Sequence, residues 1–465
     1  GIFSVGAQAA AFHAGPAVII SFLIAGIVCG AAVMCYAEFA SMIPVAGSAY
    51  TFTYTTVGEI MAWIIGWDLI LEMLMAGSVI SKYWGVYLND FMRLMGWNAN
   101  TNLTFGSFHI DIAPIIIVAF FTTLLVFGTK IGARVDGAMT VLKIAIVFFV
   151  VIVGFFYVKA SNFTPFIPPS QPASTVEGSS AVTGVMTQPL WQFATGMTPS
   201  VYGVPGILSG AALVFFAFIG FDVVATASEE TKNPHKNVPL GIGVGMLLII
   251  VMYMLVAVVT TGMVSYADLA KQDSPSLATA FELVGADWAA KIISFGIVLG
   301  LATVVMVLLL GLTRIVFAMS RDGLLPRGLS KTGKHGTPAA LQIVVGAVVA
   351  LVAAFFDIGV LSDMVNIGTL SAFTLVAISI PIMRKKRPDL PRAFKMPGSP
   401  WIPILIAVAN FWLMLNLSVL TWIRFVVWLV VGFAIYFGYG YWHARLGKGD
   451  LTETLSAETD KAVNG

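Results

Sequence analysis

Five ionisable side chains interrupt long stretches of sequence that are otherwise apolar: Asp68, Glu72, Lys82, Lys143 and Asp222. If these stretches cross a membrane, each such group is costly to bury and indicates a binding or proton-transfer site. A carboxylate there suits a cation, and a buried amine suits proton exchange. The presence of Lys82 requires no binding or proton-transfer site, because its long side chain can carry the ammonium group to the membrane surface.

Asp222 follows a glycine in the sequence FFAFIGFDVV. Gly220 lies within the apolar stretch, where a glycine lowers helix stability by about 1 kcal/mol relative to alanine. In lipid, unwound backbone survives only where it lines a cavity, because its freed N–H and C=O groups need partners. Gly220 and Asp222 together therefore predict a site at a helix break. Close packing of small residues is the alternative explanation for the glycine.

Asp68 and Glu72 are four residues apart in GWDLILEMLMAG and therefore share one face of a helix. Two carboxylates on an inward face suit a guanidinium or ammonium group. The alternative is structural, with either acid protonated or hydrogen-bonded to neighbouring backbone.

Lys143 has at least one turn of apolar residues on each side in MTVLKIAIVFF. It is either an amine that exchanges a proton during a reaction cycle or a residue that reaches the membrane surface.

The composition indicates the environment of the elements that position these residues. Of the 465 residues, 58% are hydrophobic and only 10% are charged, whereas a soluble domain has about 25% charged residues. Such a chain cannot cover a surface in water, so its solvent is lipid. The net charge of +2 argues against a nucleic-acid partner. The five histidines show no metal-ligand spacing and no Ser–His–Asp set, which argues against a metal site and a membrane-embedded enzyme.

Apolar stretches of about 20 residues are long enough to cross a bilayer as helices. The sequence predicts a short first segment and eleven full spans, and nothing within them has the alternation of a strand. The segment is 1–12, and the spans are 16–42, 58–92, 113–128, 135–158, 207–230, 239–263, 288–318, 338–356, 363–383, 401–418 and 424–443. Lys and Arg concentrate in every second loop and in the tail, which predicts that these loops and the C-terminus are cytoplasmic.

Several motifs resemble the amino acid–polyamine–organocation (APC) superfamily, and most closely its cationic amino acid transporter branch. FFAFIGFDVVATASEETKNP is similar to the sixth helix of that family. AGPAVIISFLIAG and CYAEFASMIPVAGSAYTFTY are similar to its second helix and to the entry to its third. SRDGLLP and NIGTLSAF also match, so the resemblance extends over nearly the whole chain.

The resemblance implies an all-α membrane protein with the inverted-repeat fold of the leucine transporter. Twelve helices are expected: five, then five of inverted topology, then two more, with the first helix truncated because the chain begins inside it. The implied units are 1–158 (helices 1–5), an extracellular loop 159–206, 207–383 (helices 6–10), 384–443 (helices 11–12) and a disordered cytoplasmic tail, 444–465.

The family also implies a site for an amino acid. Its G-x-G-I-F motif marks the unwound centre of helix 1, whose amides bind the carboxylate, and Gly1, Ile2 and Phe3 are the part of it in this chain. The helix 6 segment whose carbonyls take the α-ammonium is matched by a run in which Phe216 would be an aromatic gate. That run is Phe216, Ala217, Phe218, Ile219 and Gly220.

Side-chain recognition and coupling are implied in the same way. Glu72 and Asp222 are the expected counter-charges for a cationic side chain, and Met306 with small residues near it would line the side-chain pocket. Lys143 would occupy the place that Na⁺ takes in sodium-coupled relatives. H⁺ is therefore the expected coupling ion, with no Na⁺ and no other cofactor.

The expectation is a secondary transporter of the plasma membrane that carries an L-α-amino acid by proton symport, with arginine or lysine first among the substrates. Amino acid exchange and transport of neutral amino acids are the alternatives. A further alternative is a receptor that binds an amino acid without transporting it. The short C-terminal tail argues against this alternative, because it offers little room for a signalling domain. The expected partners are the amino acid and the bilayer, with the chain a monomer or weak homodimer.

Overall fold

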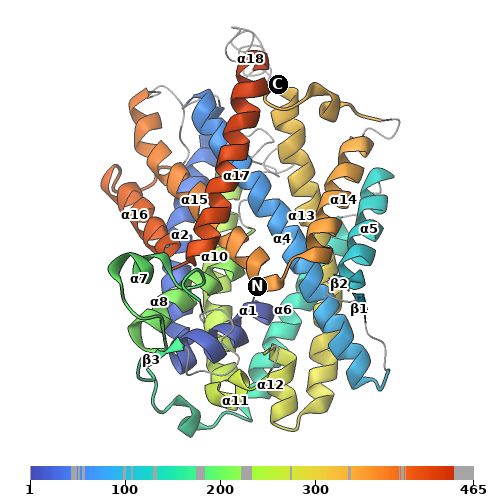
Figure 1. Ribbon diagram of the computed structural model, residues 1–465, viewed down its shortest axis with the longest axis vertical. Helices are drawn as coiled ribbons and strands as arrows, with labels where there is room; N and C mark the ends of the chain where they lie inside the picture. Colours follow the sequence, from blue (N-terminus) through green and yellow to red (C-terminus); the bar gives the residue numbers. More distant parts are fainter. Residues whose placement is uncertain are drawn as a thin grey trace.

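A computed structural model of the chain describes residues 2–42, 50, 53–54, 58–97, 101–105, 108–128, 133–173, 184–220, 233–272, 275–333, 337–386, 388, 392 and 394–444. Most of these residues are helical, and the helices run mainly along the long axis of the molecule (Figure 1). Two small antiparallel sheets lie between helices. They pair β1 (Asn102–Phe105) with β2 (Phe108–Asp111), and β3 (Gln171–Pro172) with β4 (Ser200–Val201).

Each predicted full span contains an apolar helix in the described part of the chain. Seven helical stretches there are long and apolar enough to cross a membrane, and four shorter apolar helices accompany them. The helices are α2 (Val18–Met42), α4 (Glu59–Leu94), α5 (Ile112–Val126), α6 (Ala133–Phe155), α8 (Gly203–Val214), α10 (Pro234–Met263), α13 (Asp287–Arg321), α14 (Ala339–Phe355), α15 (Ile358–Lys386), α16 (Trp401–Leu415) and α17 (Val419–Ile435). The architecture is all-α, as the sequence predicts.

The first predicted segment is not separated from the second by an open turn. The helix α1 (Ile2–Ala9) lies near mid-height of the molecule (Figure 1) and continues as a π-helix, η1 (Ala10–Ala14), and a 3₁₀ turn, η2 (Gly15–Ala17), into α2. Donors from outside stabilise the irregular turn: the Tyr202 hydroxyl donates to the Ala11 carbonyl at 2.8 Å, and the Tyr202 amide donates to the His13 carbonyl at 2.7 Å.

The helices form two groups. α2 packs along α10 and α8, whereas α4 packs along α13 and α15. α15 runs antiparallel to α4, because Ser371 contacts Asp68 while Gly368 lies against Leu71. The last turn of α15 therefore lies at the same face of the molecule as the start of α4. α17 is fixed to α4 by stacking of Trp67 on Trp428, with ring centroids 4.4 Å apart.

The outer surface is apolar, as lipid requires. On α10, side chains at helical spacing point outward and are at least half exposed: Leu240, Val244, Leu247 and Val251. The ammonium group of Lys82 is buried. It pairs with the partly exposed Asp111 carboxylate at the end of β2 at 2.8 Å and donates to the Ala353 carbonyl at 3.1 Å.

The segment 159–206 is partly regular. It contains η3 (Ala160–Phe163), β3, α7 (Leu190–Thr195) and β4, and it is bound to the α16–α17 connection through a hydrogen bond from the Val419 amide to the Gln188 carbonyl at 3.1 Å. Two further short helices, α11 (Tyr266–Ala270) and α12 (Leu277–Leu283), lie at the end of the molecule away from the C-terminus (Figure 1). A 3₁₀ turn, η8 (Arg327–Ser330), follows α13, while η9 (Tyr436–Gly440) and α18 (Tyr441–His443) extend α17. The predicted tail lies outside the described residues from position 445 onward.

Candidate functional site

The predicted helix break at Gly220 is confirmed. α8 tightens into a 3₁₀ turn, η6 (Phe215–Phe218), and the backbone then becomes extended at Ile219. Gly220 has a φ of +118°, a conformation that side-chain-bearing residues rarely adopt. The 3₁₀ turn and the extended residue leave backbone groups without helical partners, so this segment can bind a ligand. Asp222 lies outside the described residues.

A cavity of about 300 Å³ lies beside this break. Its volume is at the lower end of the range for small-molecule sites. The walls come from α4, α6, α10, α13 and the unwound segment, through Ala76, Ile80, Lys143, Phe216, Ala217, Ile219, Gly220, Tyr253, Thr303, Val304, Val307 and Leu308. Lys143, Tyr253 and Thr303 carry the polar side-chain groups of this lining, and no acidic side chain belongs to its described part.

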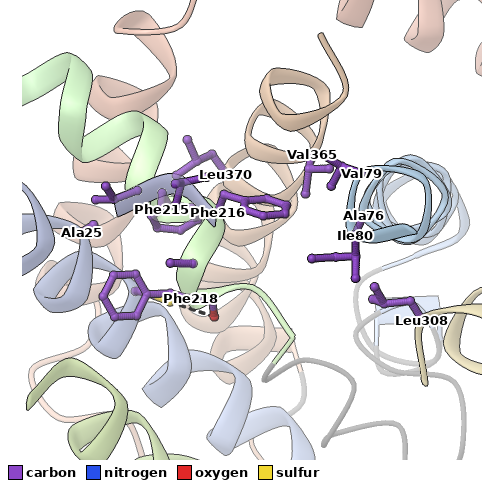
Figure 2. Packing of buried hydrophobic residues seen from close by; sticks show 14 of the residues in the cluster. Ala25, Ala76, Val79, Ile80, Phe215, Phe216, Phe218, Leu308, Val365 and Leu370 are labelled. Atoms are coloured by element: carbon purple, nitrogen blue, oxygen red, sulfur yellow. Dashed lines mark hydrogen bonds between the residues drawn. The ribbon is translucent and has the colours of Figure 1, made fainter. Parts of the chain in front are cut away.

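Phe216 and Phe218 point to opposite sides of η6. Figure 2 shows Phe216 extending toward α4, where Ala76 and Ile80 lie, and Phe216 lines the cavity. The Phe218 ring instead packs on Tyr253 at a centroid distance of 5.1 Å, away from that wall. The predicted gate residue is therefore at the cavity, whereas Phe218 does not belong to the described lining.

Tyr253 stabilises the unwound segment. Its hydroxyl donates to the Ala217 carbonyl at 2.7 Å, and its ring contacts Phe22 of α2 as well as Phe218. A buried carbonyl freed from a helix needs such a donor. Sequence reasoning missed Tyr253, for which the one available signal is a lone tyrosine in the aliphatic run LLIIVMYMLVAVV.

Lys143 lies almost three turns into α6, which begins at Ala133, and it lines the cavity. Its ammonium group donates to the Thr303 hydroxyl at 2.8 Å, and that hydroxyl donates to the Gly300 carbonyl at 3.0 Å. Gly300 leaves room for the lysine stem, because a Cβ there would lie 3.2 Å from Lys143 Cγ. Lys143 is thus a deep amine beside the break, and Thr303 is a partner that the sequence did not indicate.

The predicted acids lie in α4 but outside the described cavity lining. Glu72 and Asp68 are fully buried, and the Ser371 hydroxyl donates to Asp68 Oδ2 at 2.7 Å. Glu72 is one helical turn from Ala76, on the same face. Met306 is partly buried on α13 and also lies outside the lining, to which its neighbours Val304 and Val307 contribute.

The helix that carries the predicted helix 1 residues contacts the unwound segment. Ile2 is the first residue of α1, and α1 contacts η6. The Phe3 carbonyl accepts a hydrogen bond from the Tyr87 hydroxyl of α4. Gly1 and the side chain of Ile2 lie outside the described structure. Within the described ranges, no three His, Cys, Asp or Glu side chains lie close enough together to hold a metal ion.

Comparisons with known proteins agree with this arrangement. A family model described as "Amino acid permease" matches residues 1–439. The chain is 42% identical over 446 residues to a branched-chain amino acid permease of Bacillus subtilis (strain 168), covering 94% of this chain and 89% of the relative. It is 39% identical over 454 residues to a methylthioribose transporter of the same strain, covering 96% and 91%. It is 36% identical over 391 residues to cationic amino acid transporter 3, mitochondrial, of Arabidopsis thaliana, covering 83% and 59%.

Proposed function

The chain belongs to the amino acid permease family of the APC superfamily, and on that premise we propose that it is a secondary transporter that moves an L-α-amino acid with an apolar side chain across the plasma membrane. The observation that supports this most directly is the cavity of about 300 Å³, in which unwound backbone at 216–220 faces a wall of aliphatic side chains. The inverted repeat of units 1–158 and 207–383, with helices 384–443 added, belongs to the same proposal.

The two charged groups of an amino acid suit the two broken helices. The carbonyls of 216–220 are the acceptors for the α-ammonium group. The amides in the first turn of α1, the positive end of the helix dipole, are the donors for the carboxylate. The contact between α1 and η6 supports this assignment, because the two elements are neighbours.

The cargo side chain then lies against Ala76, Ile80 and Leu308. A cationic side chain buried there would need a counter-charge, and the described lining offers none. An aliphatic side chain needs only apolar contact, so leucine, isoleucine and valine fit best. The relative named as a branched-chain amino acid permease supports this choice.

A cationic cargo is the second candidate. Glu72 lies one turn from Ala76 on the same face of α4, within reach of a long guanidinium side chain, and one relative is named as a cationic amino acid transporter. Arginine as cargo would use Glu72, and Asp222, as counter-charges.

Lys143 is the proposed proton site. Its ammonium group lies in the cavity lining beside the unwound segment and donates to the Thr303 hydroxyl at 2.8 Å. Release of the proton would remove the charge that strengthens the donation to Thr303 beside the break, and would so couple protonation to the shape of the cavity. The coupling ion is then H⁺, with the basic face and the C-terminus in the cytoplasm. Amino acid exchange without net proton movement is the alternative.

The test is uptake of radiolabelled leucine into proteoliposomes with and without an inward proton gradient. We expect the gradient to drive accumulation, and unlabelled isoleucine and valine to compete. The variant Lys143→Met keeps a stem of similar length without the amine and should lose gradient-driven accumulation while retaining exchange of labelled for unlabelled leucine. Competition by arginine but not by leucine would overturn the proposal of an apolar cargo. Competition by methylthioribose alone would overturn the proposal of an amino acid cargo. Binding without accumulation would identify a receptor.

A further inference from the structure

Glu38 is a fully buried carboxylate near the C-terminal end of α2, four residues before Met42. A carboxylate removed from water is destabilising unless a cation or several hydrogen-bond donors replace the water. The cavity and the proposed transport chemistry do not use Glu38. Its partners therefore show what it does.

Arg384, Arg392 and Met396, which contact Glu38, come from the end of α15 and the segment after it. Arg384 grips the carboxylate with two nitrogens, Nε to Oε1 at 2.9 Å and Nη2 to Oε2 at 2.7 Å. The Met396 amide donates to Oε2 at 2.7 Å, and the Met396 carbonyl accepts from Arg384 Nη2 at 2.7 Å. Arg392 Nε lies 3.7 Å from Oε1. Glu38, Arg384 and the Met396 backbone form a closed ring of charge-assisted hydrogen bonds, which is strong only in one geometry.

This ring joins the two helix groups of the molecule. α2 packs mainly along α10 and α8, whereas α15 packs mainly along α4 and α16. The ring lies at the last turn of α15, hence at the face that the basic loops predict to be cytoplasmic. The C-terminal end of α15 also favours a cation, because the helix dipole is negative there.

Three aromatic side chains in successive contact link the unwound segment beside the cavity to the part of α2 that carries Glu38. Phe215 of η6 packs edge-on against Phe373 of α15 at a centroid distance of 5.8 Å. Phe373 packs in the same way against Tyr36 of α2 at 5.4 Å, two residues before Glu38. These three fully buried side chains fill the space between the unwound segment and the α2–α15 contact. A shift of η6 is therefore passed by packing to the turn of α2 that carries both Tyr36 and Glu38.

We propose that Glu38, Arg384 and the Met396 backbone are a releasable cytoplasmic lock, intact while the cavity is closed toward the cytoplasm and broken when cargo leaves on that side. The inference rests on the proposed transport function, because a lock of this kind has a role only in a protein that alternates between two openings. Glu38 is then a positioning residue that sets the balance between the two states and touches no cargo.

A native cysteine of the chain, Cys35, can report whether the lock is open. Cys35 is fully buried and lies three residues before Glu38, on the same face of α2. The other cysteine, Cys29, is removed as Cys29→Ala. The rate at which fluorescein maleimide labels Cys35 in the purified full chain then measures how often the end of α2 separates from α15.

We expect Glu38→Gln and Arg384→Gln each to raise the labelling rate about tenfold, which corresponds to a shift of about 1.4 kcal/mol between the two states. Removal of an anion and removal of a cation change thiolate formation in opposite directions, so a rise with both variants reports exposure and not reactivity. The double variant Glu38→Gln/Arg384→Gln should label no faster than the single variants. It removes both charges of the two-nitrogen pair, so it decides the matter if a single variant fails to fold.

Arg93→Gln is the matched control. It removes a two-nitrogen pair with Glu282, at 2.9 and 3.0 Å, near the opposite end of the molecule and should leave Cys35 labelling unchanged. Unchanged labelling in a folded double variant, or equal acceleration by Arg93→Gln, would overturn the lock. Failure of the wild-type chain to accumulate leucine would overturn the proposed function instead, since the labelling assay requires no cargo.

Discussion

At the scale of single residues, the proposed preference for an apolar cargo can be tested at Ala76, a small side chain in the aliphatic wall of the cavity. Ala76 and Ile80 of α4 and Leu308 of α13 all line the cavity. In the proposed binding mode, a branched cargo side chain lies against the Ala76 methyl group. The size of residue 76 should therefore set the size of the cargo.

We expect Ala76→Leu to weaken leucine binding about tenfold or more and to leave alanine binding nearly unchanged, because the added carbons occupy the place of the cargo side chain. Competition binding with labelled alanine measures both affinities. Met306→Leu is the control, since Met306 lies on α13 outside the lining and the substitution conserves volume. A selectivity change with Met306→Leu, and none with Ala76→Leu, would assign the pocket to Met306.

Some residues of the candidate site could be predicted from the sequence and others could not. Lys143 and Gly220 were predictable because an amine and a glycine are conspicuous within an apolar helix. Tyr253 and Thr303 were not, because each is an ordinary residue type whose role arises only from contact with a helix far away in the sequence. For Glu72 the helix is as expected, but its distance from the cavity depends on helix rotation, which the sequence does not determine.

At the scale of elements, helix contacts depend on glycines that let side chains approach the backbone. Trp67 of α4 donates its indole N–H to the Trp428 carbonyl of α17 at 2.9 Å. Gly432 leaves the space that the Trp67 indole occupies, so a Cβ at 432 would overlap the ring. This contact attaches α17 to the helix that carries Ala76.

Gly432→Ala should destabilise the chain by about 1–3 kcal/mol, because the Trp67 ring or α17 must move. The measurement is the Tm of the purified protein in detergent. Gly438→Ala, six residues further on, meets no atom within 4 Å and should leave Tm unchanged. Equal Tm values for the two variants would show that the Trp67–Trp428 stack does not fix α17.

The elements themselves were largely predictable. Span length is fixed by the thickness of the bilayer, so runs of apolar residues near 20 predict helices such as α4 and α13 to within a few residues. The continuous π- and 3₁₀-helical turns η1 and η2 were not predictable, because Tyr202, a residue nearly two hundred positions away, supplies their donors. The ion pair of Lys82 was not predictable for the same reason, since its partner Asp111 belongs to another element.

At the scale of the whole molecule, two helix groups meet around one cavity. The group of α2, α8 and α10 carries the unwound segment and Tyr253, and the group of α4, α13 and α15 carries the aliphatic wall and Arg384. A ligand between the groups contacts both, so its arrival or loss changes how they pack. This arrangement suits alternating access, in which one group moves against the other.

The most direct measurement is the structure of the full chain determined with leucine bound. We expect the ammonium group at the carbonyls of 216–220, the carboxylate at the first turn of α1, and the side chain against Ala76, Ile80 and Leu308. Leucine bound elsewhere, or a cavity left without leucine at saturating concentration, would contradict the assignment of this cavity as the transport site.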